Sequence, residues 1–153
     1  MREYHALAGI LTITLRDEAG RVVDECRADN LITNAGRALL GQLLTGGVQL
    51  DASKLFIAIG TGNAPAKVED TALAARVGAE TAKATQPVAD GAQMKVTVSA
   101  TYEGAKVTGT QAVCEAGIEL EGPKGRILYN RVVFPPINRT TTLDMTLSWE
   151  VLF

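Results

Sequence analysis

The C-terminal segment, residues 143–153, restricts the fold of this chain more than any other stretch. Apolar side chains occupy every second position in it, and polar side chains lie between them up to Glu150. Because neighbouring side chains of a strand point to opposite faces, this period of two predicts a β-strand with one buried face. We expect Trp149 to lie in the core and the chain end at Phe153 to be structural rather than a loose tail. The apolar positions are Leu143, Met145, Leu147, Trp149, Val151 and Phe153.

Further strands are predicted by the same reasoning. Apolar and polar residues alternate over residues 11–16 and 94–103, which indicates two more half-buried strands. A short apolar run at residues 55–59 predicts a buried strand. The turn residues 17–20 predict a hairpin whose second strand covers residues 21–27.

A second hairpin is predicted around the turn EGPKG, with residues 115–121 and 125–134 as its strands. We expect Pro135 and Pro136 to break the chain after it, because proline cannot donate to a strand ladder. Residues 135–142 are therefore predicted to form a long loop.

The segment DNLITNAGRALLGQLLTGG predicts a helix. Thr33 or Asn34 can cap its start by accepting a backbone N–H, and Gly46 with Gly47 can end it. We expect its leucines to face a sheet; they are Leu39, Leu40, Leu43 and Leu44. A second short helix is predicted over residues 71–77, capped by Asp70 and ended by Gly78.

These elements predict a mainly β fold: an antiparallel β-sandwich or barrel with one or two short helices. A parallel α/β fold is disfavoured, because the last third of the chain contains no helix to connect parallel strands. We expect residues 1–153 to form one β-rich domain, with residues 1–9 as an N-terminal arm.

Composition excludes several classes of partner. The formal net charge of −2 argues against binding through nucleic-acid phosphates. No apolar run approaches the length of a membrane span, and the N-terminus lacks the cleavage site of a signal peptide. Cys26 and Cys114 are far apart in the sequence and form no CxxC motif, so free thiols in a reducing compartment are favoured over a disulfide.

The stretch FIAIGTGNAP at residues 56–65 resembles the start of a nucleotide-binding strand and loop. However, Pro65 stands where the dinucleotide motif needs its third glycine, and Lys67 is followed by valine rather than by Ser or Thr. The predicted helix also starts near Asp70, too late to place its N-terminus under a phosphate. We therefore predict a loop at residues 60–69 that binds no nucleotide.

Other catalytic chemistry has little support. His5 is the only histidine, which excludes a histidine-based zinc site, and no serine lies in a nucleophile elbow. The acids are scattered, and Glu119 and Glu121 are predicted on an exposed strand face. A hydrolase with a carboxylate pair and a sugar-binding module remain alternatives. The aromatic candidates for a sugar site are Tyr4, Tyr102, Tyr129 and Trp149.

Four segments, taken in order, resemble a family of small structural proteins encoded in tailed-phage and prophage virion gene clusters. They are NLITNAGRALLGQLLTGG, FIAIGTGNAPAKVEDTALAAR, EAGIELEGPKGRILYNRVVFPPI and TLDMTLSWEVLF. The resemblance covers most of the chain after residue 30. It implies a β-rich, non-enzymatic particle component with no cofactor, made in the host cytoplasm and located in the virion.

The resemblance implies assembly with other virion proteins, in a tail, baseplate or fibre-attachment position or, alternatively, as a capsid decoration protein bound to the major capsid protein. A homo-oligomer is expected, with neither nucleic acid nor membrane as a partner. Loops and termini are the predicted contact elements, because their backbone donors are free to pair with a neighbour. The candidate contact residues are Tyr4, His5, Asn63, Pro65, Pro135, Pro136, Asn138 and Arg139.

Overall fold

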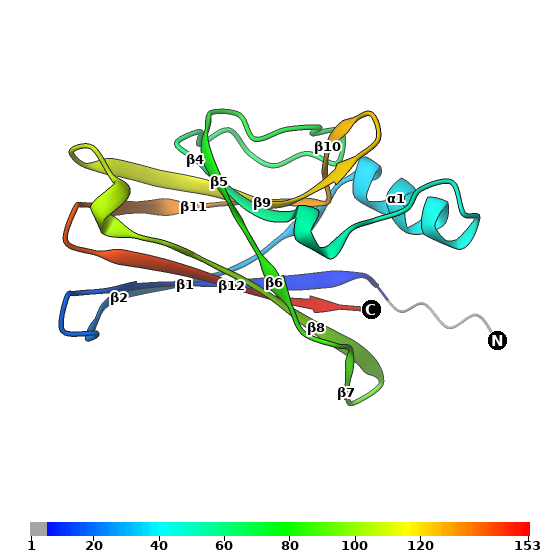
Figure 1. The fold of residues 1–153 in the computed structure, drawn as a ribbon, viewed down its shortest axis with the longest axis horizontal. Helices are drawn as coiled ribbons and strands as arrows, with labels where there is room; N and C mark the ends of the chain where they lie inside the picture. Colours follow the sequence, from blue (N-terminus) through cyan, green and yellow to red (C-terminus); the bar gives the residue numbers. More distant parts are fainter. Residues whose placement is uncertain (1–5) are drawn as a thin grey trace.

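The computed structural model describes residues 6–153, in which two antiparallel sheets face each other as a β-sandwich (Figure 1). The sheets do not close into a barrel. The first sheet has the order β2 (Val22–Asp29), β1 (Ala8–Arg16), β12 (Asp144–Leu152), β8 (Gln93–Tyr102) and β6 (Lys83–Ala84), with β7 (Val88–Asp90) also paired to β8.

The second sheet has the order β3 (Leu31–Ile32), β11 (Asn130–Arg139), β9 (Gln111–Gly122), β4 (Leu55–Gly60) and β5 (Arg76–Thr81), with β10 (Gly125–Leu128) also paired to β9. Within residues 6–153, one α-helix, α1 (Asn34–Leu44), lies at one end of the sandwich, and two short 3₁₀ turns are present, η1 (Ala52–Lys54) and η2 (Gly104–Lys106) (Figure 1). The mainly β prediction is thus confirmed as a sandwich.

The C-terminal strand β12 lies in the middle of the first sheet, between β1 and β8. Its side chains alternate between buried and half-buried as the sequence predicts, and Trp149 is completely buried. The core between the sheets is formed by β12 with its neighbours and by strands of the second sheet. Its largest apolar members include Leu11, Ile13, Ile57, Ile59, Phe134, Met145, Leu147 and Trp149.

Both predicted hairpins are present. Asp17 closes the first turn, since its Oδ1 accepts from the N–H groups of Ala19 and Arg21, and Gly20 has a φ of 78°. The second turn connects β9 to β10 and uses Gly125 at a φ of 114°. Positive φ is readily available to glycine alone, so each turn has a local cause in the sequence.

The prediction that Pro135 and Pro136 break the chain is wrong. Strand β11 runs through both residues, and its register against β9 shifts between Val133 and Ile137. The prolines therefore occupy a bulge, where a missing N–H costs no ladder hydrogen bond. The predicted loop over residues 135–142 shrinks to the short turn between β11 and β12.

The second predicted helix is also absent: residues 71–75 form an irregular segment that ends in a turn at residues 74–75, and Arg76 opens β5. The N–H groups of Ala74 and Ala75 donate to the side chain of Glu115 instead of to helical carbonyls. Here a tertiary contact outweighs local helix propensity, which contributes less than about 1 kcal/mol per residue. Asp70 accordingly caps no helix.

Helix α1 has the predicted N-cap, because Thr33 Oγ1 accepts from the N–H of Gly36 at 3.0 Å. Its contact with the sheet is shorter than predicted: Leu39 is buried and Leu40 half-buried, whereas Leu43 and Leu44 are exposed. A Cβ on Gly36 would meet the carbonyl oxygen of Tyr129 at 2.2 Å. The first turns of the helix therefore lie directly on the sheet, while its C-terminal end extends past it (Figure 1).

We expect the replacement Leu39→Ala to destabilise the protein by about 2–5 kcal/mol, since this side chain is only 2% exposed. Leu44→Ala is the matched control in the same helix: Leu44 is 92% exposed, and its loss should change stability by less than about 0.5 kcal/mol. Denaturant unfolding measures both. Equal midpoints for the two variants would show that α1 does not pack on the sheet in solution.

Candidate functional site: a buried carboxylate and guanidinium network

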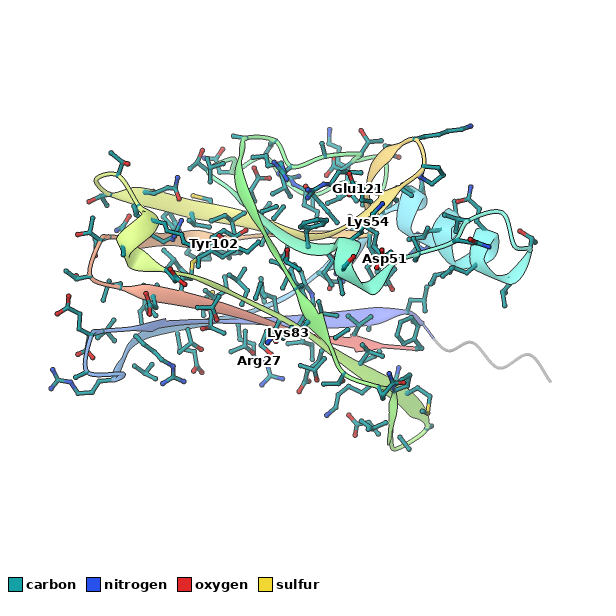
Figure 2. All side chains as sticks on the ribbon, in the orientation of Figure 1. Arg27, Asp51, Lys54, Lys83, Tyr102 and Glu121 are labelled. Atoms are coloured by element: carbon teal, nitrogen blue, oxygen red, sulfur yellow. The ribbon has the colours of Figure 1, made fainter. Side chains whose placement is uncertain are left out.

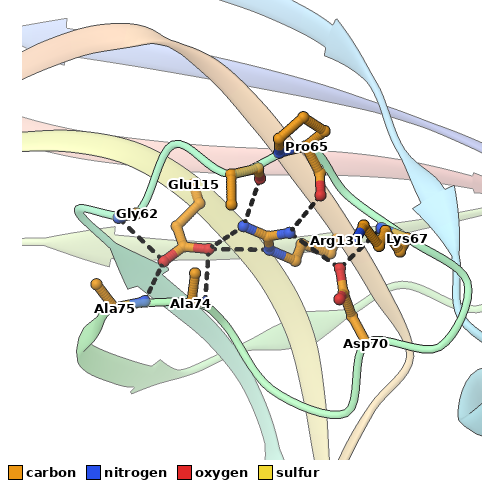
Figure 3. A network of polar contacts seen from close by, with 9 residues as sticks. Gly62, Pro65, Lys67, Asp70, Ala74, Ala75, Glu115 and Arg131 are labelled. Atoms are coloured by element: carbon orange, nitrogen blue, oxygen red, sulfur yellow. Dashed lines mark hydrogen bonds and ion pairs between the residues drawn. The ribbon is translucent and has the colours of Figure 1, made fainter.

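A buried polar cluster is centred on Glu115 of β9, which is completely buried (Figure 3). Its Oε1 accepts from the N–H groups of Gly62 at 3.1 Å and Ala75 at 2.7 Å. Its Oε2 accepts from the N–H of Ala74 at 3.0 Å. The carboxylate thus fastens the loop between β4 and β5 to the strand beneath it.

Arg131 of β11 supplies the positive charge of this network and is also buried. Its Nε and Nη2 lie 2.9 and 2.8 Å from Glu115 Oε2, and its Nη1 lies 2.9 Å from Asp70 Oδ2. The remaining donors reach the carbonyl oxygens of Ala64 and Pro65 (Figure 3). All five N–H donors of the guanidinium therefore have acceptors, which is the condition for burying such a charge.

Asp70 completes the network on its exposed side. Burial would raise the pKa of its carboxyl, but the N–H of Lys67 and the guanidinium of Arg131 outweigh burial and hold that pKa below its usual value. Asp70 is therefore ionised at neutral pH. A general acid needs the opposite, a carboxyl whose pKa is raised.

The glycines of the FIAIGTGNAP stretch have a structural explanation in this network. A Cβ added to Gly60 or Gly62 would lie 2.4 or 2.6 Å from Glu115 Oε1, closer than atoms can approach. The backbone reaches the carboxylate only because these residues lack a side chain. The glycine loop does hold an anion, but that anion is the protein's own glutamate.

We predict that ATP, GTP and NAD at millimolar concentration leave the thermal midpoint unchanged, because the Gly62 amide already donates to Glu115. Differential scanning fluorimetry with magnesium chloride alone as the control measures this. A saturable rise of the midpoint with any of the three nucleotides would contradict it.

A second ion cluster lies further along β9, at Glu119. Its Oε1 accepts from Arg76 Nε at 2.9 Å, and its Oε2 from Arg126 Nη1 at 3.1 Å. Glu119 was predicted on an exposed face and is in fact buried, whereas Glu121 is exposed as predicted. The two arginines cover Glu119, and Arg126 also stacks 3.6 Å from the centre of the Phe56 ring.

A neutral polar contact joins the two sheets through the core. Asn130 Oδ1 accepts from the N–H of Ile118, and its Nδ2 donates to Asn30 Oδ1 at 3.0 Å. Trp149 Nε1 donates to the same oxygen of Asn30, which connects β12 to the opposite sheet. Buried amides bonded in this way favour one register of the sheets over others.

The sequence-predicted contact residues are divided by the structure. Asn63 and Pro65 are exposed on the loop after β4, and Pro135, Pro136 and Asn138 are exposed along β11. Arg139 differs from the expectation for a contact residue, because it is buried. Tyr4 and His5 lie outside the described residues, and Ala8 and Gly9 of the predicted arm belong to β1.

Glu115 and Arg131 were missed by sequence reasoning, although a signal existed. Each is a charged residue inside an otherwise apolar strand segment, VCEAGI for Glu115 and NRVVF for Arg131. Opposite charges in two strands of one predicted hairpin could have been paired on that basis. Asp70 and the loop amides could not have been assigned to this network from the sequence, since they come from a separate part of the chain.

No protein-family model, curated protein or solved structure matches the chain. Within residues 6–153, no group of three or more His, Cys, Asp or Glu side chains is placed to hold a metal ion. No helix in this part of the chain is long and apolar enough to cross a membrane. The two cysteines are free: Cys114 is buried and Cys26 half-buried.

Proposed function

We propose that this chain is a non-enzymatic structural component of a tailed-phage virion that acts by protein–protein contact. The observation that carries the proposal is that the four segments of the resemblance meet in the internal contacts described above. The first contributes Asn30, the second Gly62 and Asp70, the third Glu115, Asn130 and Arg131, and the fourth Trp149. Residues of the four resembling segments thus hold the protein's own loops and sheets in place, and a rigid fold of this kind suits a scaffolding role.

The network of Glu115 and Arg131 also supports a contact role for the loop between β4 and β5. Glu115 and Arg131 bind its backbone at Gly62, Ala64, Pro65, Ala74 and Ala75. Asn63 and Pro65 are exposed on this fastened loop. A surface held in one conformation loses little entropy on binding, which favours it as a docking element.

Strand β2 supports association through an edge. Among the described residues no strand pairs with its outer side, and Val22 and Val23 are about half exposed at 49% and 51%. An exposed strand edge offers unpaired backbone groups to a neighbouring chain. A tail, baseplate or fibre-attachment position is slightly preferred over capsid decoration, as in the expectation from the resemblance.

Purified particles from the strain that encodes the chain test the proposal. Quantitative mass spectrometry should find the protein in them at a fixed ratio to the other virion proteins. A ratio close to that of the major capsid protein supports decoration, and a much lower ratio supports the tail. Absence of the protein from particles would overturn the proposal.

A pair of variants tests the contact loop in the same particles. The exposed double change Asn63→Ala and Pro65→Ala should leave the thermal midpoint nearly unchanged but reduce incorporation. Glu18→Ala, in the exposed turn after β1, is the control and should incorporate normally. Equal incorporation of both variants would show that this loop does not contact other virion proteins.

A further inference from the structure

Arg139, near the end of β11, is a buried cation that no carboxylate of the described residues contacts directly. It is 6% exposed, and within residues 6–153 no acidic side chain forms an ion pair with it. Its Nη1 donates to Gln111 Oε1 at 2.9 Å, its Nη2 donates weakly to the carbonyl oxygen of Glu103 at 3.4 Å, and its Nε has no partner. A buried charge in this condition is unfavourable unless something else compensates it.

The other arginines of the second sheet show what Arg139 lacks, which is a carboxylate partner. Arg131, equally buried, has two carboxylates and acceptors for all its donors. Arg76 and Arg126, which are more exposed, share Glu119. Each of these three arginines therefore contacts at least one acid. Arg139 departs from this pattern although it is among the most buried of them.

The Arg139 guanidinium lies beside a cavity of about 330 Å³ between the two sheets. Tyr102 and Gln111 share its wall with Arg139, and Lys106 of η2 reaches it from the rim. Figure 2 shows Tyr102 between the two layers, on the side of the molecule away from α1. The cavity is large enough for a small organic group, and its lining holds two cations, Arg139 and Lys106, and one acid, Glu80.

Three side chains define the electrostatics of this cavity. The Tyr102 ring lies 5.1 Å from the Arg139 guanidinium carbon, and its hydroxyl is already bonded to the carbonyl of Ile57 and the N–H of Glu80. Glu80 is the acid of the cavity lining, and it forms no ion pair with Arg139. Burial lowers the pKa of the Arg139 guanidinium, while Tyr102 and Glu80 act in the opposite direction.

We propose that this cavity binds a carboxylate group, with Arg139 as the residue that recognises it. The edge formed by Nε and Nη2 is the weakly bonded one, and a planar carboxylate fits such an edge with two parallel hydrogen bonds. Nε is shielded in this structure, so a two-bond contact with a carboxylate requires the guanidinium to turn toward the cavity and to release its long contact with Glu103.

A single negative charge suits the cavity better than a phosphate dianion, because Glu80 on the same lining repels additional charge. Lys106 at the rim adds attraction for the incoming anion, although it is also 3.5 Å from Glu103. The carboxylate belongs either to a small organic acid or to an acidic side chain of a second copy of this chain.

The test follows the Nε–Hε resonance of Arg139 by ¹⁵N NMR during titration with acetate and succinate, with sodium chloride at matched ionic strength as the control. The resonance is assigned by its loss in Arg139→Lys. We expect a saturable shift with the carboxylates alone, accompanied by a rise of the thermal midpoint. A shift that follows protein concentration without added acid assigns the carboxylate to a second copy.

Two variants keep the proposal falsifiable. Lys106→Gln lies at the exposed rim, should fold normally and should weaken carboxylate binding several-fold. Arg21→Lys, in the exposed turn after β1, should bind as the parent does. The proposal is overturned if neither acid nor protein concentration shifts the resonance in a saturable way, or if Lys106→Gln and Arg21→Lys bind alike.

Discussion

Removal of residues 149–153 is expected to leave the chain unfolded or insoluble. The deletion removes Trp149 and Val151 from the core, and it exposes the edges of both neighbouring strands, since β1 and β8 pair with β12 on either side. Loss of a buried Trp costs about 3–5 kcal/mol, and each buried aliphatic side chain contributes about 1.5–3 kcal/mol. Together with the lost pairing, these terms rival the total stability of a domain, about 5–15 kcal/mol.

Removal of Phe153 alone is the control for this truncation. The side chain is 39% exposed, although its backbone N–H and carbonyl both pair with Met94. We expect this shorter deletion to fold and to melt at a moderately lower temperature. Circular dichroism and calorimetry measure both variants. A cooperative melt of the longer truncation would show that β12 is an appendage and that the core lies elsewhere.

Arg131→Met is expected to destabilise the protein by about 3–5 kcal/mol, because it leaves the buried carboxylate of Glu115 without its guanidinium. Glu115→Leu removes the opposite partner and should cost a similar amount. The double variant should cost less than the sum of the two, since it leaves neither charge uncompensated. Denaturant unfolding of the four proteins gives the coupling between the residues.

Hydrogen exchange shows which part of the chain is destabilised by the loss of Arg131. In the Arg131→Met protein the amides of Gly62, Ala74 and Ala75 should exchange faster than in the parent, because their acceptor is no longer fixed. Arg21→Met is the matched control: its ion pair with Asp17 is exposed and should contribute at most about 1 kcal/mol. The contrary result is that the losses of stability in Arg131→Met and Glu115→Leu simply add in the double variant while the loop amides exchange as in the parent. That result would contradict the role of this pair in holding the loop.

The sequence predicted those features of the fold that depend on local patterns. Period-two alternation identified β1, β8 and β12, and Thr33 was recognised as a helix cap because its reach to Gly36 is local. Where a distant contact decides the outcome, the prediction failed. The segment after Asp70 became a turn and a strand because its amides bind Glu115, which lies far away in the chain.

The candidate site illustrates the same limit. A polar residue on a strand is normally assigned to solvent, and Glu115 and Glu119 do lie on the outer face of their sheet. The loop between β4 and β5 then covers Glu115, and Arg76 and Arg126 cover Glu119, so this face is buried in part. Alternation along one strand cannot reveal a second covering layer, since that layer is contributed by other segments.

The pairing of β1 with β12 also determines when the molecule can fold. Ala8 lies opposite Leu152, so β1 can pair with β12 only after the whole segment between the two strands has been synthesised. On the ribosome the hairpin of β1 and β2 can form early, but the edge of β1 that pairs with β12 stays free until β12 has been synthesised. Such long-range pairing also slows folding, because a large loop must close before the contact forms. The nascent chain is therefore most prone to aggregation in this interval, and a chaperone that binds apolar strands would act on it then.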